Sequence, residues 1–246
     1  MGKILITAPV RQDEEIFDLY LDSLRNLYVP DGFTIDKAFI FHNCEHLAKK
    51  LNKTEKAIIN NDNTDYKCDE NTHEWKGENF SQVTIMKNAL LKYAYENNYD
   101  YVFLVDSDLI LHQNTLIKLM EANKDMVVEV FWTKWDNQSE AMPNAWSCDN
   151  YTVVPSEVKK WKQKGLYPVG MAGACTLLSR KVLERNVNFT PIPNVSWTIW
   201  EDRAFCIRSM CAGIQPWLDT HYPAIHLYRP SELEKFKKGE LKHGIY

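Results

Sequence analysis

One apolar run, Tyr101–Val105, constrains the fold more than any other feature of the sequence, because it stops abruptly at Asp106-Ser107-Asp108. A continuously apolar strand is typical of a parallel sheet that is covered on both faces, whereas strands with one solvated face alternate. Residues 81–97 precede it with apolar side chains at helical spacing, and Ser81 is the predicted N-cap. The pattern predicts a helix–strand unit of an α/β sheet, with a ligand site just beyond the strand.

The rest of the chain repeats this alternation of short apolar runs and amphipathic segments. Strands are predicted at 4–8, 38–41, 57–59, 126–132 and 222–226, and helices at 13–27, 45–51, 116–122, 179–184 and 201–211. Residues 60–76 are polar and aperiodic, which indicates a loop, and Gly170–Ala174 is a predicted glycine-rich turn leading into the helix at 179. A chain of 246 residues therefore predicts one α/β domain with a mostly parallel, Rossmann-like sheet flanked by helices.

Charge and composition exclude several classes of function. The net charge of −4 gives no basis for general binding to nucleic acid. There is no run of about 18 apolar residues and no N-terminal leader pattern, so we expect no transmembrane segment and a cytoplasmic protein. The six cysteines contain no CxxC pair, which favours free, buried thiols over a zinc cluster or disulfides.

The Asp106-Ser107-Asp108 motif is a candidate metal site. Divalent cations such as Mg²⁺ prefer carboxylate oxygens, and two aspartates one residue apart at a strand end can both face one ion. A DxD tripeptide alone is usually a solvated turn. The buried strand before it and His226 at a later strand end favour the metal-site interpretation, since neutral imidazole is a sound ligand for Mn²⁺.

The block from Met86 to Asp108, with Lys87-Asn88-Ala89, Asn97-Asn98-Tyr99-Asp100, the apolar strand and the DxD, resembles the core of GT-A glycosyltransferases. It is most similar to the broad group that includes the inverting enzymes of glycosyltransferase family 2. The resemblance implies a single GT-A domain over 1–246, with a nucleotide-binding half at about 1–108, an acceptor-binding half at about 109–230 and a tail at 231–246. It also implies a nucleoside-diphosphate-sugar donor, UDP-sugar favoured over GDP-sugar, and Mn²⁺ or Mg²⁺ bridging the diphosphate to Asp106 and Asp108.

The resemblance also assigns the donor side of the site. It places the end of the first strand beside the base and phosphates, and Ser107, Gly173 and Ala174 beside the sugar. Asn43 takes the base-contacting position where the family often has Asp, which leaves the base open. Lys87 replaces the usual Arg, although a solvated helix lysine is the alternative. The implied donor-binding residues are Thr7, Pro9, Val10, Arg11, Asn43, Lys87, Asp106, Ser107, Gly173, Ala174 and Arg229.

The same resemblance assigns the acceptor side to Trp200-Glu201-Asp202. Asp202 is the implied general base of an inverting transfer, and Trp200 would contact the acceptor. Glu201 would hold an acceptor hydroxyl or the sugar, and exchange of the two carboxylate roles is the alternative. A carboxylate at a helix start is also explained by simple capping, which is the alternative for the pair. His226 would complete the metal shell, with a packed histidine as its alternative.

Three other functions and one other partner are alternatives to this hypothesis. A HAD-type phosphatase uses DxD in its first strand with Thr or Val where this chain has Ile110, and a nucleotidyltransferase needs a glycine-rich loop that Ala8–Arg11 lacks. A non-catalytic sugar-binding module is the third alternative. Lysines at 235, 237, 238 and 242 leave peripheral contact with an anionic membrane open, but interspersed glutamates favour a solvated helical tail. No motif specifies the acceptor, the stereochemistry or the oligomeric state.

Overall fold

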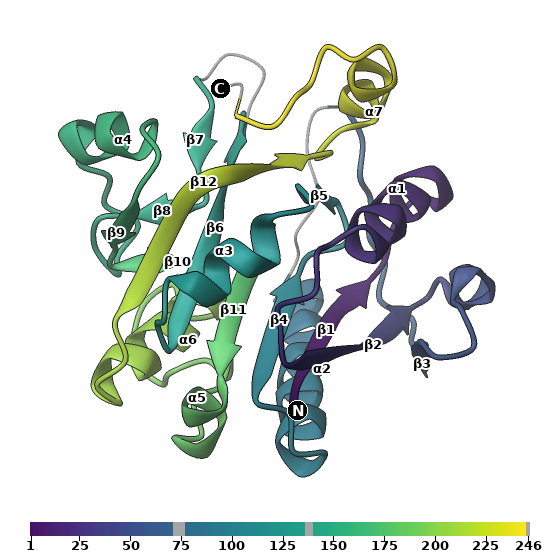
Figure 1. Ribbon diagram of the computed structural model, residues 1–246, viewed down its shortest axis with the longest axis horizontal. Helices are drawn as coiled ribbons and strands as arrows, with labels where there is room; N and C mark the ends of the chain where they lie inside the picture. Colours follow the sequence, from purple (N-terminus) through teal and green to yellow (C-terminus); the bar gives the residue numbers. More distant parts are fainter. Residues whose placement is uncertain (71–76, 136–139, 245–246) are drawn as a thin grey trace.

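The computed structural model describes residues 1–70, 77–135 and 140–244. Its principal sheet has ten strands, of which eight lie in the order β3-β2-β1-β4-β11-β6-β12-β5. The strands β3, β2, β1 and β4 are parallel, β11 is antiparallel to both of its neighbours, and β12 runs parallel to β6 (Figure 1). The expected α/β class is confirmed, with the continuous parallel block in the N-terminal half.

The strands of the principal path and its side branches have the following bounds: β1 Gly2–Val10, β2 Phe33–His42, β3 Lys56–Asn60, β4 Tyr101–Val105, β5 Leu109–Ile110, β6 Met126–Thr133, β7 Met142–Pro143, β9 Leu166–Pro168, β11 Cys175–Ser179 and β12 Pro216–His226. A second sheet pairs β8 Ala145–Trp146 with β10 Met171–Ala172. The strand β11 was missed in the sequence, where a turn was predicted to lead straight into a helix.

The helices are α1 Glu14–Arg25, the 3-10 helix η1 Glu45–Lys50, α2 Gly77–Glu96, α3 Thr115–Glu121, α4 Pro155–Trp161, α5 Arg180–Glu184, α6 Glu201–Cys211 and α7 Pro230–Lys237. Ser81 is not the N-cap of α2, since the helix already includes Gly77 and the Ser81 hydroxyl donates to the Gly77 carbonyl. Asp13 does cap α1, because its carboxylate accepts from the amides of Glu15 and Ile16.

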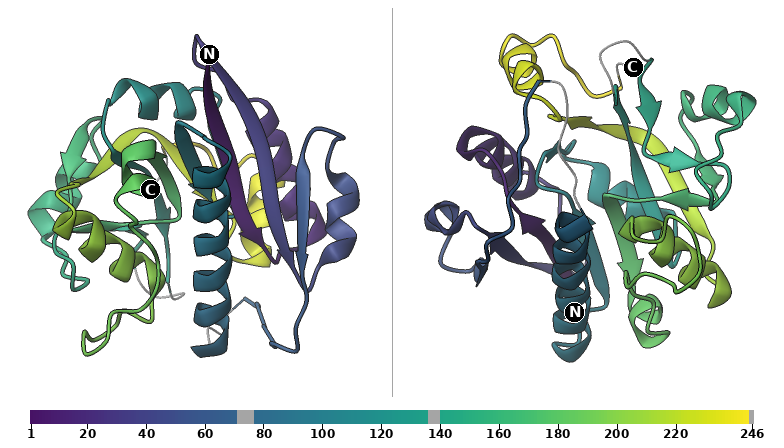
Figure 2. Two further views of the ribbon diagram at one scale, coloured as in Figure 1. Left: turned by 90° about the horizontal axis from the view of Figure 1, so that it is seen from below. Right: turned by 180° about the vertical axis from the view of Figure 1, so that it is seen from behind.

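Helices cover both faces of the sheet, which explains the apolar strands. On one face α1 and α3 bury side chains such as Phe17 and Leu116. On the other face α2, α5 and α6 bury side chains such as Leu91 and Phe205 (Figures 1 and 2). Strand β4 lies between the two layers, so its five residues face apolar neighbours on each side.

The C-terminal helix and the cysteines differ in part from expectation. Helix α7 forms and its lysines at 235, 237, 238 and 242 are exposed, as expected of a solvated helical tail, but Leu233 is buried in the core and Lys237 forms an ion pair of 2.7 Å with Glu15. All six cysteines are free as expected, yet Cys68, Cys148 and Cys211 are exposed. In the described parts of the chain, no helix combines the length and apolarity that a membrane crossing requires.

Candidate active site

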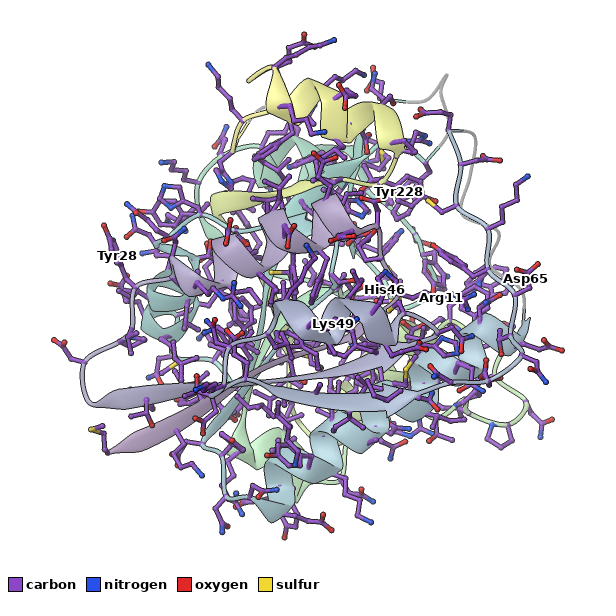
Figure 3. All side chains as sticks on the ribbon, turned by 90° about the vertical axis from the view of Figure 1, so that its right-hand side faces the viewer. Arg11, Tyr28, His46, Lys49, Asp65 and Tyr228 are labelled. Carbon is purple, nitrogen blue, oxygen red and sulfur yellow. The ribbon has the colours of Figure 1, made fainter. Side chains whose placement is uncertain are left out.

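A cleft of about 1160 Å³ opens where β1 and β4 end, between α2, α6 and the end of β12. Its lining includes Arg11 from the N-terminal half of the chain and Tyr228 from the C-terminal half, and Figure 3 shows these two side chains on the same side of the molecule. A volume of this size accommodates a nucleotide sugar, since small-molecule sites usually measure about 300–1000 Å³. The strand ends therefore converge on a ligand-sized space, as expected for an open α/β sheet.

The turn after β4 brings the DxD to His226. The Leu109 amide donates to the Asp106 carbonyl at 3.2 Å, and the short strand β5 then pairs Leu109 with His226. The Leu227 amide donates to the Asp108 carbonyl at 2.9 Å. As a result His226 Nε2 lies 3.2 Å from Asp108 Oδ2, although the two residues are far apart in sequence.

The Nδ1 atom of His226 is hydrogen-bonded to a buried hydroxyl. Thr133 Oγ1 lies 2.6 Å from His226 Nδ1, and the Thr133 side chain is buried. A proton on Nδ1 donated to that hydroxyl leaves Nε2 with a free lone pair directed at Asp108. This is the arrangement by which a second residue orients a metal-ligating histidine.

The donor set suits Mn²⁺ or Mg²⁺, but it is not a complete metal cage. Among the described residues, no group of three or more His, Cys, Asp or Glu side chains is arranged to hold a metal ion. Asp108 and His226 are in contact, whereas Asp106 Oδ1 lies 3.7 Å from the Lys87 ammonium. An incomplete protein shell fits a cation that keeps water and takes phosphate oxygens from its substrate.

Lys87 connects the two carboxylate groups of the cleft. Its ammonium lies 2.9 Å from Glu201, 3.5 Å from Asp202 and 3.7 Å from Asp106, and only 4% of its side chain is exposed. The solvated-lysine alternative is therefore wrong. Helix α2 packs against both β1 and α6, which places Lys87 between the strand-end aspartates and the start of α6. One buried cation thus links the DxD to the Glu201-Asp202 pair.

The Glu201-Asp202 pair begins α6, as predicted. The structure records no side-chain hydrogen bond that caps this helix, and the helix begins after Trp200. Burial raises the pKa of Asp202 to about 7, although the Lys87 ammonium acts in the opposite direction. Burial likewise raises the pKa of Asp106 to about 6. A carboxyl group that titrates near neutral pH is suited to take up a proton during a reaction.

The sequence of residues 36–235 matches the model of the N-terminal domain of glycosyltransferase family 25. The chain belongs to this family. Procollagen galactosyltransferase 2 of Mus musculus is 22% identical over 235 residues, covering 87% of this chain and 37% of that protein. Procollagen galactosyltransferase 1-A of Xenopus laevis is 26% identical over 162 residues, covering 62% of this chain and 26% of that protein. The family 25 chain thus spans little more than a third of the length of the mouse relative.

Solved structures show the same fold at low sequence identity. Residues 1–349 of S. aureus TarS superpose with a TM-score of 0.56 at 12% identity, over 91% of this chain and 60% of TarS 1–349. The mannosyltransferase PcManGT of Pyrobaculum calidifontis, in complex with GDP-Man and Mn²⁺, gives a TM-score of 0.54 at 11% identity, over 95% and 59%. These superpositions confirm the expected GT-A fold. The family match over residues 36–235 confirms the expected relationship to glycosyltransferases, rather than to phosphatases or nucleotidyltransferases.

Within this family 25 chain, nearly all residues implied by the resemblance line the cleft: Pro9, Val10, Arg11, Asn43, Lys87, Asp106, Ser107, Asp108, Gly173, Ala174, Trp200, Glu201, Asp202, His226 and Arg229. Thr7 does not line it. The Thr7 side chain is fully buried in the sheet, and its hydroxyl donates to the Ala38 carbonyl at 2.5 Å. Thr7 lies three residues before the end of β1, and its hydroxyl stabilises the pairing of β1 with β2 instead of contacting a ligand.

Two arginines of the cleft are already engaged by the chain. Arg11 donates to the Thr64 carbonyl at 2.9 Å and stacks over Tyr66, and Arg229 donates to the carbonyls of Glu70 and Trp135. Each guanidinium has further donors, because arginine carries five N–H groups. The loop after β3 therefore folds over the donor side of the cleft and orients these arginines.

The predicted base-contacting position also differs from expectation. Asn43 has a positive φ of 54°, and its amide donates to Asp62, whose carboxylate also contacts His42 Nε2 at 3.0 Å. The family often has an aspartate at the end of β2, where this chain has Asn43. Here the nearby carboxylate is that of Asp62, which follows the neighbouring strand β3. Asp62 does not itself line the cleft, whereas His42, Asn43 and Cys44 do.

Asn144 was missed in the sequence. Its buried amide donates to the Gly173 carbonyl at 2.8 Å, and its carbonyl oxygen accepts from the Phe131 amide. Asn144 thereby ties the Gly173 turn to β6. A lone asparagine between two short irregular strands carries no sequence signal for this role.

Gly173 is required by the position of Asp202. A Cβ on Gly173 would overlap the Asp202 carboxylate, which packs against the glycine backbone. We expect Gly173→Ala to lower kcat about tenfold, because the Cβ would displace Asp202, the implied base, and a small displacement of a reacting group is costly. Steady-state kinetics would measure the change.

Gly77→Ala is the matched control for Gly173→Ala, because a Cβ there meets only Ile199 at an ordinary 3.8 Å. Equal kinetics of the two variants would show that the Asp202 position does not depend on Gly173.

Proposed function

We propose that this chain transfers a sugar from a nucleoside-diphosphate sugar to an acceptor hydroxyl, with Mn²⁺ or Mg²⁺ as cofactor and inversion at the anomeric carbon. UDP-sugar is the favoured donor and GDP-sugar the alternative. The observation that carries the proposal is the arrangement around Lys87, in which a DxD–histidine group and a glutamate–aspartate pair face each other across one cleft. Such a site can hold a leaving group on one side and deprotonate a nucleophile on the other.

Asp106, Asp108 and His226 would hold the cation in this proposal. When bound, the cation supplies positive charge that stabilises the departing diphosphate. Thr133 fixes the ring of His226, and the β5–β12 pairing fixes Asp108 against it. The chain thus prepares one edge of the metal shell and leaves phosphate oxygens to complete it.

The donor would extend from the ends of β1 and β2 toward Gly173. Pro9, Val10 and Asn43 would contact the nucleoside, and Arg11 and Arg229 would offer their remaining N–H groups to phosphate. Ser107, Gly173 and Ala174 would contact the sugar, where the absence of large side chains lets its ring approach the backbone. Lys87 is too fully engaged by carboxylates to serve as the principal phosphate ligand.

Asp202 is the proposed general base and Glu201 the proposed hydroxyl-orienting group. The proton of the acceptor hydroxyl passes to the Asp202 carboxylate while its oxygen bonds to the anomeric carbon. The bond from that carbon to the diphosphate breaks, and the nucleoside diphosphate leaves. The Lys87 ammonium contacts both Asp202 and Glu201, so the two carboxylates are fixed relative to each other before the acceptor binds.

Release of nucleoside diphosphate tests the function directly. UDP-galactose, UDP-GlcNAc and GDP-mannose should be incubated with the protein and Mn²⁺, with and without acceptor. UDP-galactose is placed first because the curated relatives are galactosyltransferases by name. We expect metal-dependent release from one donor class and little from the other. Tight donor binding without any release would instead support the sugar-binding module.

Asp108→Ala should lose metal-dependent donor binding while the fold survives, since the carboxylate lies at the cleft and not in the apolar core. We expect the Mn²⁺-dependent affinity for nucleoside diphosphate to fall at least tenfold, because a ligand of the bridging cation is removed. Calorimetric titration with and without Mn²⁺ measures the effect. Asp31→Ala, at an exposed turn, is the control, and unchanged affinity in Asp108→Ala would remove Asp108 from the metal shell.

A further inference from the structure

An aromatic cluster extends outward from Asp202 and past the mouth of the cleft. Trp200 contacts Tyr151 with ring centroids 5.1 Å apart, and Trp197 stacks on Trp200 at 6.4 Å with an interplanar angle of 24°. Trp200 and Tyr151 line the cleft, whereas Trp197 lies beyond it and is 52% exposed. Large indole faces at this level of exposure indicate a surface that a ligand covers.

The backbone around the cluster is held in a rarely adopted conformation. Within the described residues, eight non-glycine residues have positive φ, and five of them are asparagines. The other three are Tyr151, Ala174 and Trp197, with φ of 63°, 69° and 61°. Left-handed backbone is costly for bulky side chains and concentrates at functional sites. Tyr151 and Trp197 contact the Trp200 ring, and Ala174 follows Gly173, which packs against the Asp202 carboxylate.

A buried arginine fixes the two loops that present these rings. Arg203 donates to the Asp149 carbonyl and to the Ser196 carbonyl, and its guanidinium lies 3.1 Å from the Asp149 carboxylate. The two carbonyls belong to the loops that carry Tyr151 and Trp197. The rings are therefore oriented before any ligand arrives, which lowers the entropic cost of binding.

We propose that the acceptor is a neutral oligosaccharide that occupies two ring sites on this aromatic cluster. The inference rests on the proposed function. The ring with the nucleophilic hydroxyl lies on Trp200 and Tyr151 with that hydroxyl at Asp202, and the preceding ring lies on Trp197 outside the cleft. Sugars fit because one face of a pyranose presents C–H groups to an indole while its rim of hydroxyls donates to carboxylates.

Charge favours a neutral acceptor over an anionic one. Three carboxylates, those of Glu201, Asp202 and Asp149, lie on the acceptor side and share two buried cations, Lys87 and Arg203. Among these described residues negative charge is in excess, so an anionic acceptor would be repelled. A peptide acceptor is the competing class, and the experiment below separates the two.

The test removes the outer ring site and leaves the inner one. Trp197→Asn deletes the indole, and Asn tolerates the left-handed backbone at this position. Initial rates should be measured with methyl glycosides of single sugars and of disaccharides whose terminal sugar is one of those single sugars. A collagen peptide serves as the protein acceptor. We expect the wild-type protein to favour disaccharides by about tenfold in kcat/KM, and Trp197→Asn to lose that preference without a change for monosaccharides.

Two controls complete the design. Tyr28→Ala removes an aromatic ring of similar exposure on the opposite side of the molecule from the cleft residues Arg11 and Tyr228 (Figure 3). This variant should retain the disaccharide preference. Release of nucleoside diphosphate to water, without acceptor, should be equal in all three proteins. If the wild-type protein releases no nucleoside diphosphate from any donor, with or without acceptor, the proposed function itself is contradicted. The outcomes that overturn the acceptor proposal are different.

The acceptor proposal is overturned by donor turnover with no transfer to any of the methyl glycosides. Transfer to the collagen peptide alone overturns it in favour of a protein acceptor. It is also overturned by a disaccharide preference that persists in Trp197→Asn, or by an equal loss of activity on monosaccharides and disaccharides.

Discussion

Asp202→Asn should lower kcat by about 10²-fold or more while the donor Kd stays nearly unchanged, because general-base catalysis typically contributes 10²–10⁴-fold. Asn preserves the size and hydrogen-bonding capacity of Asp but cannot accept the proton of the acceptor hydroxyl. The variant also retains the packing against Gly173. Single-turnover transfer rates and donor titrations in the presence of Mn²⁺ measure the two quantities.

Glu201→Gln is the matched comparison for Asp202→Asn. Glu201 makes the shortest contact with Lys87, at 2.9 Å, so its loss should alter the position of the pair and lower kcat by a smaller factor. A larger loss in Glu201→Gln than in Asp202→Asn would reverse the two assigned roles. Full activity of Asp202→Asn would leave Asp202 with a capping role only.

Lys87→Met should produce the largest loss of stability of any cleft variant. It leaves Asp106, Glu201 and Asp202 without their shared cation, and removal of one partner from a buried ion pair costs about 3–5 kcal/mol. The lower end of this range applies because Asp106 and Asp202 partly reach solvent, so we expect a loss of about 3 kcal/mol at pH 8.5. Urea unfolding in the presence of a chelator measures the free energy.

The loss in Lys87→Met should shrink at acid pH. Lys87 lowers the pKa of Asp202, so its removal raises that pKa further above the unfolded value. A carboxyl group with a raised folded pKa binds more protons in the folded state, and stability therefore falls as pH rises through the folded pKa. We expect the variant to approach the wild-type protein at pH 5.5. An equal loss at both pH values would contradict the shared-cation interpretation.

Two lysine variants control this experiment. Lys87→Arg keeps the charge and should retain most of the stability. Lys92→Met removes a lysine from the same helix whose side chain is 75% exposed, and it should have little effect at either pH.

The sequence predicted the parts of the fold that depend on local patterns. Strand β4, helix α2 and the DxD could be predicted because each depends on a few consecutive residues. A strand buried on both faces is a continuous apolar run, and a helix has apolar residues at regular spacing. The same is true of α1, whose Asp13 cap lies next to the first helical turn. Strand β11 left a weaker mark, since Cys175–Ser179 is short and follows a glycine-rich turn.

Contacts between distant residues could not be predicted from the sequence. The burial of Lys87 depends on α6 packing against α2, and the supply of Asp62 to the end of β2 depends on the pairing of β2 with β3. The resemblance assigns Thr7 to the ligand because it lies near a strand end, but Thr7 lies three residues before the end of β1 and is fully buried against β2. Family resemblance identified the residues of the cleft, and only the fold determines their partners.

The position of β11 has a consequence for synthesis of the chain. Strand β4 pairs with β1 on one side and with β11 on the other, and β11 comes from the second half of the chain. Until Ser179 has left the ribosome, β4 is the open apolar edge of a nascent parallel sheet. Such an edge recruits strands from other chains, and domains emerge at about 5–20 residues per second. We therefore expect the N-terminal half of the chain to expose this edge for several seconds during synthesis, and a chain cut after the DxD to expose it permanently and aggregate.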